Sequence, residues 1–370
     1  MGNGGIEQYR VMLVVQSLRM GGAETMVEAL ANALVRHGCF VRVVVLQAEE
    51  TIISERLRES GVPLTMMGKR PGIDLSLIGR LTREMKLFKP YVVHSHLPIL
   101  HYVVPSANRA GVPILVHTLH NIAYRETRSR IIAAFNGRCY RSGRVIPVAL
   151  SEINQQSIIE RYHLKAADIP IVPNGIDLSR YKRRSTFSTG EVFEVVNIAR
   201  FEEAKNHTAI VEAAEILGQR GIKTRFHLYG TGSLRQRTAD MVKAKGLSDA
   251  IVFHGVTDDV PAALASADAF VLPSLYEGMP MVLIEAMASG LPIIASRVGG
   301  IPDMVDDGVS ALLCEPRGDS IADGLERLAS DEALRIRLGS AAAEQSQLFG
   351  SDAMASHYLS VYARTERGCA

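Results

Sequence analysis

Short apolar runs rich in β-branched residues alternate with helical stretches along this chain, and that alternation restricts its fold more than any other feature. A run such as 10–16 is typical of a strand buried on both faces of a parallel sheet. The stretch 23–37 follows with apolar residues at helical spacing, and Gly38 is placed to end that helix. Strand, turn and helix in repeated order indicate a parallel sheet between helices, which binds ligands at the carboxyl ends of its strands.

The alternation occurs in two series, separated by polar, turn-rich stretches at 173–177 and 182–190 that are typical of a linker. The expected strands are 10–16, 41–46, 90–94 and 113–117, then 193–199, 224–229, 250–254, 269–272 and 292–296. A length of 370 residues also suggests two domains, at roughly 100 to 200 residues each. We therefore predict an α/β fold with two tandem Rossmann-like domains facing a cleft, followed by a terminal helix at 351–364 with one apolar face.

Charge is distributed unevenly along the chain. The formal net charge is +2, but residues 1–170 hold 21 Lys+Arg against 13 Asp+Glu, whereas residues 171–370 hold 20 against 26. A basic half can favour nucleic acid, an anionic membrane or phosphorylated substrates. Trp is absent and aromatic residues make up 6% of the chain, so a base-stacking surface has little material. We expect no nucleic-acid partner.

The four cysteines, Cys39, Cys139, Cys314 and Cys369, show no CxxC spacing and indicate neither a zinc site nor a disulfide framework. The early apolar run at 11–15 is much shorter than the roughly 18 residues that a membrane span needs. We therefore expect a cytoplasmic protein without a secretion signal.

The segment 273–292 follows an expected strand, and its local signals agree with one another. Pro280 suits the first turn of a helix, and Gly290 with Pro292 suits its end. The free N–H groups of residues 281–283 would then lie at the carboxyl edge of the sheet, where they can bind a phosphate. Glu277 and Glu285 flank this helix start, and a carboxylate can accept paired hydrogen bonds from sugar hydroxyls. Apolar neighbours argue against a merely solvated role for Glu285.

Two cations follow the first strand of the second series. Arg200 ends the strand region and Lys205 comes after a short acidic loop, so the pair is placed to neutralise a diphosphate. Gly21 and Gly22, between the first strand and the first helix, let backbone approach a ligand closely. The full GxGxxG pattern is absent there, which argues against a dinucleotide cofactor. Gly230 belongs to another partial glycine motif, for which a simple turn is an equal alternative.

Histidines concentrate at strand ends, at positions 94, 96, 117 and 120. No acidic or cysteine partner lies at ligand spacing, so a hydrogen-bonding or proton-handling role for one or two of them is favoured over a metal site. A basic stretch from Arg125 to Arg144 interleaves arginines with apolar residues and holds one acid, Glu126. An anionic membrane contact and an ordinary solvated helix face are equally compatible with it.

Taken together, several segments resemble glycosyltransferase family 4, the retaining enzymes of the GT-B fold. The resemblance extends over nearly the whole chain. It rests on Gly-Gly-Ala-Glu at 21–24, His-Ser-His at 94–96, Pro-Asn-Gly-Ile-Asp at 173–177, Arg200 with Lys205-Asn206, the E-x7-E spacing of Glu277 and Glu285, and Gly-Gly-Ile-Pro-Asp at 299–303.

The resemblance implies an acceptor-side domain at 1–176, a nucleotide-sugar donor domain at 177–345 and a C-terminal helical segment at 346–370 that returns to the first domain. It implies that Glu285 holds the ribose, Arg200 and Lys205 the diphosphate, and Glu277 the donor sugar. His120 would touch the donor hexose and His96 would lie on the acceptor side. The donor set implied is Gly21, Gly22, Arg200, Lys205, Gly230, Glu277, Gly278, Met279, Val282, Leu283 and Glu285.

The expected function is a retaining, metal-independent transferase that moves a hexose from a UDP- or GDP-linked sugar to a glycan or lipid-linked acceptor, in cell-surface polysaccharide or glycolipid biosynthesis. Glu277, His120, Arg200 and Lys205 would act in catalysis, with no cofactor and no metal. A nucleotide-sugar epimerase and a non-catalytic sugar-nucleotide-binding protein are the alternatives. Peripheral binding to the inner face of a membrane through Arg125 to Arg144 is a further expectation.

Overall fold

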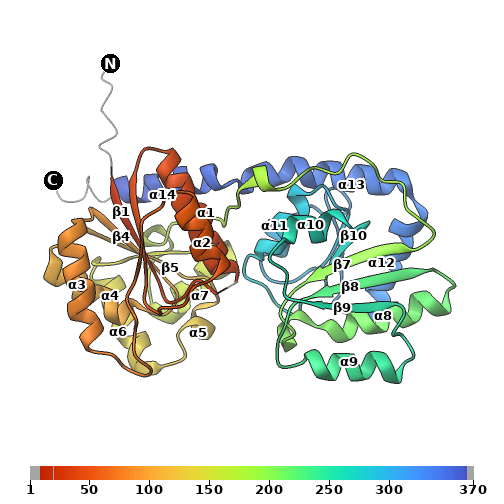
Figure 1. Cartoon of the computed structure of the whole chain (residues 1–370), viewed down its shortest axis with the longest axis horizontal. Coiled ribbons are helices and arrows are strands. Elements are labelled where there is room, and N and C mark those ends of the chain that lie inside the picture. The colour runs from red at the N-terminus through yellow and green to blue at the C-terminus, as the bar shows by residue number, and fades with distance from the viewer. Residues whose placement is uncertain (1–8, 20, 365–370) are drawn as a thin grey trace, which may run out of the picture. The chain divides into compact units, whose positions relative to one another are not determined.

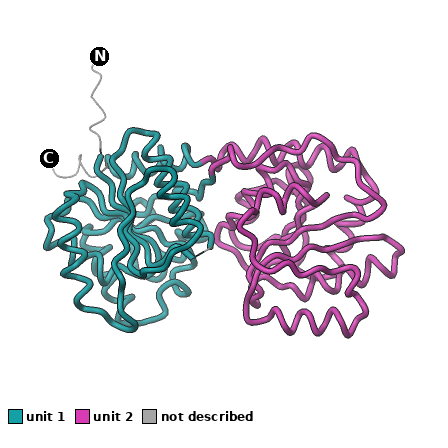
Figure 2. The backbone as a smooth tube through the Cα atoms, viewed as in Figure 1, with its two compact units in different colours: residues 1–176, 351–370 teal, residues 177–350 magenta. Residues whose placement is uncertain are grey.

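The computed structural model describes residues 9–19 and 21–364, which divide into two compact α/β units (Figure 2). Unit 1 comprises the described residues of 1–176 and 351–370, and unit 2 comprises 177–350. In each unit a parallel six-stranded sheet lies between helices (Figure 1). The prediction of two Rossmann-like α/β domains is confirmed.

Unit 1 has the sheet order β3-β2-β1-β4-β5-β6. Its strands are β1 (Arg10–Val15), β2 (Phe40–Val45), β3 (Leu64–Met66), β4 (Val92–His96), β5 (Ile114–Thr118) and β6 (Ile146–Val148). Its helices are α1 (Gly22–Arg36), α2 (Ile52–Glu59), α3 (Ser76–Phe88), α4 (Leu100–Ala110), α5 (Ala123–Glu126), α6 (Arg130–Arg141), α7 (Glu152–Tyr162) and α14 (Ser351–Arg364).

Unit 2 repeats this arrangement with the order β12-β11-β10-β7-β8-β9. Its strands are β7 (Phe193–Ile198), β8 (Thr224–Tyr229), β9 (Ile251–Gly255), β10 (Ala269–Leu272), β11 (Ile293–Ser296) and β12 (Leu312–Cys314). Its helices are α8 (His207–Gln219), α9 (Arg235–Ala244), α10 (Val260–Ala265), α11 (Met281–Ala288), α12 (Gly318–Ser330) and α13 (Glu332–Gln345).

Strand order determines where a ligand can bind in each unit. In each sheet, the first strands of the series are added toward one edge and the later strands toward the other edge, and the switch point is where this order reverses. The switch point lies between β1 and β4 in unit 1 and between β7 and β10 in unit 2. Helices that cross on opposite faces leave a crevice at the carboxyl ends of such a strand pair. The loops that follow β7 and β10 carry Arg200, Lys205 and Glu277.

The terminal helix α14 packs on unit 1, as the sequence predicts, and contacts α1. A buried polar network joins it to the sheet. His94 on β4 lies with Nδ1 2.9 Å from Tyr362 Oη and with Nε2 2.8 Å from Thr118 Oγ1. Thr118 Oγ1 lies 2.8 Å from Tyr358 Oη. The buried side-chain polar atoms of His94 and Thr118 are therefore hydrogen-bonded, as stability requires, and His94 has a structural role.

The polar stretch 182–190 is part of unit 2 and is not a linker, which corrects the prediction. Arg184 forms an ion pair with Asp268 at 2.8 Å, and its N–H donates to Ser289 O. Phe187 is buried, and its carbonyl accepts a hydrogen bond from Arg335 Nε. Only the stretch at 173–177 coincides with the division between the units, at 176/177. Among the described residues, no helix is long and apolar enough to span a membrane.

Candidate functional site

The loops after β7 and β10 are joined by backbone and side-chain hydrogen bonds. Leu275 N–H donates to Ala204 O at 2.8 Å, and Asn206 Nδ2 donates to Pro273 O at 3.1 Å. Asn206 has a left-handed backbone with φ of 51°, which asparagine tolerates better than most residues. These bonds hold the short 3₁₀ turn Glu203–Lys205 beside the segment that leads to Glu277.

Lys205 and Glu277 form an ion pair at this junction. Lys205 Nζ lies 2.5 Å from Glu277 Oε1, and Ser274 Oγ donates to the same oxygen at 2.6 Å. The carboxylate is buried, so the attraction is weakly screened by water. Among the residues that the structure describes, no hydrogen bond reaches Glu277 Oε2. This oxygen can therefore accept a hydrogen bond from a ligand hydroxyl.

The paired glycines at 299–300 fit closely against the backbone of Glu277. Gly299 has φ of +55°, and a Cβ atom built on it would lie 1.9 Å from Glu277 O. Gly300 N–H donates to that same carbonyl at 3.2 Å. The motif at 299–303 therefore acts as a support that fixes the position of Glu277.

Substitution of Gly299 by alanine is expected to destabilise the protein by about 2–5 kcal/mol, from left-handed backbone strain and the clash with Glu277 O. Gly308 is a matched control because its φ is +72° and nothing lies within 4 Å of a built Cβ. Gly308→Ala should cost about 1–2 kcal/mol. Urea unfolding measures both, and equal losses for the two variants would refute the support role of Gly299.

Helix α11 begins directly after this loop and carries Glu285 on its buried side. Glu285 is 7% exposed, and Tyr181 Oη donates to its Oε1 at 2.9 Å. Pro280 is the N-cap and provides no side-chain hydrogen bond to the first turn. Leu283 N–H donates to Pro280 O at 3.1 Å, so the prediction that this group is free is wrong. Among the described residues, no partner is recorded for the N–H groups of Met281 and Val282.

The remaining residues of the predicted donor set differ in their exposure to solvent. Gly278 is half-buried and Met279 is buried. Arg200 is distinct, because its side chain is 71% exposed and pairs with Glu202 at 3.2 Å. A charged group on such an exposed side chain can move toward a ligand at little cost.

Gly230 has a structural reason for its identity. Its φ is +137°, and a built Cβ would lie 2.0 Å from Ala199 O, in the loop that carries Arg200. The glycine therefore permits β8 to end directly against that loop. Close backbone packing explains the glycine here without a ligand, which was the alternative left open by the sequence.

The predicted site residues of unit 1 lie after β1, β4 and β5. Gly21 is the N-cap of α1 and, having no side chain, leaves the first turn of that helix without a side-chain cap. His96 is completely buried at the end of β4 and does not reach the surface, so it has no direct access to an acceptor in this structure. Its Nδ1 lies 3.0 Å from Nε2 of His120, which follows β5 and is half-buried.

The hydrogen bonding of this histidine pair assigns its protons. Burial lowers the pKa of His120 to about 4 and that of His96 well below its usual range, so both are neutral at pH 7. His96 Nε2 is buried and has no hydrogen-bond partner among the described residues. A buried lone pair without a partner is tolerated better than a buried N–H. His96 Nδ1 therefore donates to His120 Nε2, which leaves the proton of the neutral His120 ring on Nδ1.

Glu126 is a functional candidate that the sequence did not reveal. Its Oε2 accepts a hydrogen bond from Asn121 N–H at 2.8 Å, and its Oε1 lies 3.8 Å from His117 Nε2. Burial raises the pKa of Glu126 to about 8. The carboxyl group holds the loop that begins at His120. Glu126 is the one acid in a basic stretch, and that pattern indicated a charge on the protein surface. No local sequence signal predicts that the Glu126 side chain is buried.

Glu126 should make stability depend on pH. Its folded pKa of about 8 lies above the usual value of 4.5, so its stabilising contribution is complete below pH 4.5 and is lost as pH rises toward 8. Glu126→Gln cannot ionise and should lack this loss. Urea midpoints of both proteins at pH 5 and pH 9 test the prediction. From pH 5 to pH 9, the free energy of unfolding of the wild type should fall by several kcal/mol relative to that of the variant. A difference between the two proteins that does not change with pH would contradict the prediction.

The basic stretch from Arg125 to Arg144 is only partly available for a partner. Arg144 is tied to the chain by hydrogen bonds to Asn108 Oδ1 and to the carbonyls of Val112 and Pro113. The other arginines of the stretch are exposed, at positions 125, 128, 130, 138 and 141. Within the described part of the chain, no group of three or more His, Cys, Asp or Glu side chains is arranged to hold a metal ion.

Family models match both parts of the chain. Residues 20–180 match the model described as Glycosyltransferase Family 4, and residues 180–345 match the model described as Glycosyl transferases group 1. The two matches meet near the division between the units. They fit the resemblance that the motifs indicated.

Curated proteins and solved structures give concordant similarities. The chain is 27% identical over 320 residues to a putative glycosyltransferase EpsF of Bacillus subtilis, covering 82% of each chain. It is 27% identical to the UDP-Gal:alpha-D-GlcNAc-diphosphoundecaprenol alpha-1,3-galactosyltransferase of Escherichia coli, over 71% of this chain and 72% of that one. Anabaena Alr3699/HepE, solved with UDP and glucose, superposes with a TM-score of 0.83 at 19% identity over 96% and 99% of the two chains, which establishes the fold.

Proposed function

The chain belongs to glycosyltransferase family 4, with the two-domain GT-B fold, and from that membership and the geometry in unit 2 we propose that it is a retaining hexosyltransferase. The donor is a UDP- or GDP-linked sugar, and the acceptor is a glycan or a lipid-linked sugar. The reaction belongs to the synthesis of a cell-surface polysaccharide or glycolipid.

The observation that carries the proposal is the joined pair Lys205 and Glu277 at the switch point of unit 2. A buried carboxylate with one oxygen available can bind a sugar hydroxyl, while the adjacent ammonium group can bind a phosphate. The two groups therefore match the two sides of a sugar–phosphate linkage. Neither an isolated cation nor an isolated carboxylate would match both.

The neighbouring groups complete a binding scheme for a nucleotide sugar. Glu285 accepts hydrogen bonds from the ribose hydroxyls. One of them replaces the hydrogen bond that Tyr181 Oη donates to Glu285 in this structure. Arg200 and the N–H groups of Met281 and Val282 add positive charge around the diphosphate, at the positive end of the α11 dipole. Gly278 and Met279, which follow Glu277 in the chain, form one wall of the proposed donor site.

The proposed reaction is a same-face substitution. The bond between the anomeric carbon and the phosphate oxygen breaks, and a bond to the acceptor oxygen forms on the same side of the sugar. The acceptor hydroxyl proton passes to the leaving phosphate, which departs as nucleoside diphosphate. Lys205 and Arg200 stabilise the negative charge that develops on the diphosphate, and this is the main catalytic contribution. Glu277 orients the sugar and acts without forming a covalent intermediate.

In unit 1, His120 orients the substrate through its Nδ1–H, and His96 acts as a positioning residue behind it. The loop at Gly21 and Gly22 adds backbone N–H groups at the start of α1. No cofactor and no divalent metal takes part, because the two cations and the α11 amides supply the charge that a metal would otherwise supply to the diphosphate.

The names of the relatives support the acceptor class. The E. coli relative is named for transfer from UDP-galactose to a diphosphoundecaprenol-linked sugar. We extend a lipid-linked or glycan acceptor to this chain by analogy, together with an anionic membrane contact through Arg125 to Arg144 on the cytoplasmic face. The family matches do not favour the epimerase or the non-catalytic binding protein.

A donor panel tests the proposal. Thermal unfolding is recorded with UDP, GDP and ADP sugars, and a ligand at 100 times its Kd should stabilise the fold by about 2.7 kcal/mol. The donor that stabilises should also release free sugar and nucleoside diphosphate slowly without an acceptor, and equally fast in EDTA. Release of an epimerised nucleotide sugar would favour the epimerase. Binding without any turnover, alone or with glycan and lipid acceptors, would favour the binding protein.

A further inference from the structure

Unit 1 buries a series of polar side chains that leads from its sheet to the loop of His120. The series consists of Ser95 on β4, His117 on β5 and Glu126, the last residue of α5. We call residues 120–126 the His120 loop. We propose that Glu126 is a positioning residue for the transfer reaction, which holds the His120 loop while it is uncharged and releases the loop when it loses its proton. The inference rests on the proposed function, because that function gives His120 its role at the substrate.

Glu126 closes the His120 loop on itself. Its Oε2 accepts a hydrogen bond from Asn121 N–H at 2.8 Å, and the backbone N–H of His120 also interacts with the carboxyl group. On the other side of the loop, Asn154 Nδ2 on α7 donates to Asn121 O at 2.7 Å. The backbone of Asn121 is thus held at both its N–H and its C=O group. Loss of the Glu126 contact would free the amides next to the His120 ring.

The hydrogen bonds of the polar series assign its protons. Ser95 Oγ donates its one proton to Val116 O at 3.3 Å. The same oxygen lies 2.9 Å from His117 Nδ1, where it therefore accepts. Burial lowers the pKa of His117 to about 3, so its ring is neutral at pH 7 and the ring proton lies on Nδ1. His117 Nε2 thus directs a lone pair toward Glu126 Oε1, which is 3.8 Å away.

This lone pair favours the uncharged form of Glu126. A carboxylate has only acceptor atoms, so its Oε1 would be buried opposite another acceptor with no proton between them. A carboxylic acid directs a proton on Oε1 toward His117, while Oε2 still accepts from Asn121 N–H. Desolvation also disfavours the charged form, and burial raises the pKa of Glu126 to about 8. Glu126 is therefore largely uncharged at pH 7 and ionises as the pH rises through about 8.

The other titratable groups around Glu126 supply no compensating charge. Tyr140 on α6 and Tyr162 on α7 interact with the carboxyl group, and burial raises the pKa of both phenols. Arg161 on α7 lies over the Tyr124 ring, with its Cζ 4.5 Å from the ring centroid. Among the described residues, no lysine or arginine forms an ion pair with Glu126. Burial lowers the pKa of the nearby histidines and keeps them neutral, at positions 94, 96, 117 and 120.

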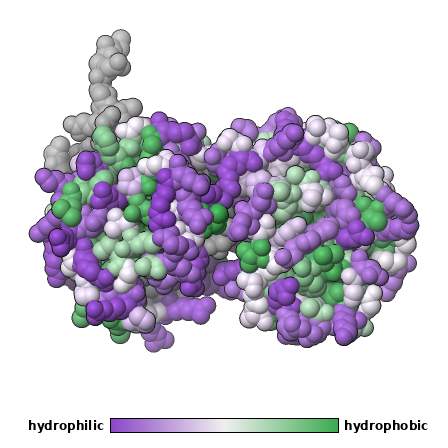
Figure 3. Space-filling model, viewed as in Figure 1, coloured by the Kyte–Doolittle hydropathy of each residue, from purple (hydrophilic) through white to green (hydrophobic). Residues whose placement is uncertain are grey.

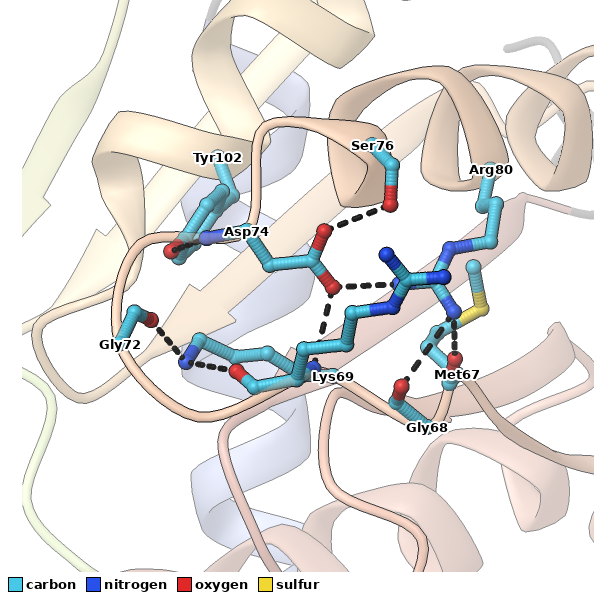
Figure 4. A network of polar contacts seen from close by, with 9 residues as sticks. Met67, Gly68, Lys69, Gly72, Asp74, Ser76, Arg80 and Tyr102 are labelled. Carbon is cyan, nitrogen blue, oxygen red and sulfur yellow. Dashed lines mark hydrogen bonds and ion pairs between the residues drawn. The ribbon is translucent and has the colours of Figure 1, made fainter.

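Asp74, a second buried acid in a loop of unit 1, has the opposite surroundings (Figure 4). Its Oδ1 accepts from Ser76 Oγ at 2.6 Å, and its Oδ2 accepts from Arg70 N–H at 3.0 Å and from Arg80 Nη2 at 2.7 Å. Hydrogen bonds from Ser76 and from Arg70 N–H lower the pKa of Asp74 to about 2. The charge of Arg80 acts in the same direction. Asp74 is therefore ionised throughout the range in which Glu126 titrates.

The cations of the neighbouring surface do not take the place of such a partner for Glu126. Arg128 and Arg130 are exposed, whereas the Glu126 side chain is 3% exposed. Figure 3 shows purple, hydrophilic side chains at the surface where Figure 1 places α5. Water and salt screen such exposed charges within about 10 Å at 0.1 M salt, so they stabilise a buried carboxylate weakly.

Loss of the proton makes the buried position of Glu126 unfavourable. A buried charge without a cation is costly, so the proton passes to solvent and the carboxylate turns toward water. That movement breaks the hydrogen bond from Asn121 N–H. His120 then loses its fixed position, and displacement of a positioned group by about 1 Å can cost about a hundredfold in rate. Turnover should therefore fall as the pH rises through about 8.

The pH profile of turnover tests the inference with the full chain and the donor that gives the largest thermal shift. Wild-type kcat should fall above about pH 8. Glu126→Gln cannot ionise and keeps an oxygen that accepts from Asn121 N–H, so it should lack this fall. Glu126→Ala should lower kcat at pH 7 by about tenfold to a hundredfold, and the glutamine variant should recover most of that loss. An alkaline fall that persists in Glu126→Gln, or is absent from the wild type, would overturn the inference.

Asp74→Asn is the matched control, because it makes the same change of an acid to its amide at a buried loop position of unit 1. Its kcat should show the same alkaline fall as the wild type. The Kd of the nucleoside diphosphate should be equal in all these proteins, since the proposed nucleotide site lies on unit 2. A structural defect that spread beyond the His120 loop would change that Kd as well.

Trypsin cleavage reports on the loop itself and needs no turnover. Arg128 lies two residues beyond the His120 loop, and cleavage after it requires local release of the backbone. At pH 7 the wild type and Glu126→Gln should be cleaved at similar rates, and at pH 9 the wild type should be cleaved faster. Comparison at one pH cancels the pH dependence of trypsin. Equal rates at both pH values would overturn the inference, whereas absence of donor binding and turnover in the wild type would overturn the proposed function.

Discussion

Replacement of Lys205 by alanine is expected to lower kcat/KM for the nucleotide sugar by about a thousandfold. Loss of one preorganised group that stabilises developing charge costs about 10²–10³ in rate. Lys205→Ala also leaves Glu277 without its cation in a buried position, where it would repel the diphosphate. Steady-state kinetics with the stabilising donor, in the presence of acceptor, measures the effect.

The protein contains a close control for this substitution. Lys245, which follows the last residue of α9, pairs with Glu215 on α8 at the same 2.5 Å distance. Lys245→Ala removes an ion pair of the same kind and should leave kcat/KM unchanged. Lys205→Arg keeps the charge and should recover part of the activity. Equal activity of Lys205→Ala and wild type would remove Lys205 from the donor site.

The second large effect is expected at Glu285, whose loss should weaken donor binding by at least about a hundredfold. Hydrogen bonds to a charged group contribute about 1.5–3 kcal/mol, and a ribose would supply two of them. Calorimetric titration with the nucleoside diphosphate and with its sugar ester measures the change in Kd for Glu285→Ala.

Tyr181→Phe separates the ligand role of Glu285 from its structural role. This variant removes the hydrogen bond to Glu285 Oε1 and keeps the carboxylate. We expect it to change the donor Kd by less than tenfold. If Tyr181→Phe and Glu285→Ala weakened binding equally, Glu285 would act mainly by holding Tyr181, and its assignment to the ribose would fail.

The parts of the fold with strong apolar periodicity were predictable from sequence. The buried central strands β1 and β10 have apolar runs, and their bounds agree with the predicted ones to within a residue or so. The outer strands β3, β6 and β12 were missed, because each has three residues and too short a pattern to distinguish from a loop. The apparent linker at 182–190 was misassigned because it is anchored by tertiary contacts with Asp268 and Arg335.

The candidate site was partly predictable from sequence because some of its residues follow predicted strands. Lys205 and Glu277 come from strand ends that any parallel sheet brings to one edge, so their proximity follows from topology. Tyr181, Ser274 and Glu126 could not be found in that way. Tyr181 and Glu126 acquire their partners through loops whose paths depend on the whole unit, and a lone polar residue in a loop carries no periodic signal.

The most direct test of the central claim is hydrogen exchange of the full chain with the nucleoside diphosphate that gives the largest thermal shift. If unit 2 holds the donor, exchange should slow at the amides of Met281 and Val282 and in the loops at 199–206 and 274–280. A nearby control is the amide of Leu283, already hydrogen-bonded to Pro280 and expected to change less. Protection confined to residues 1–176, or no bound nucleotide among UDP, GDP and ADP, would contradict the account.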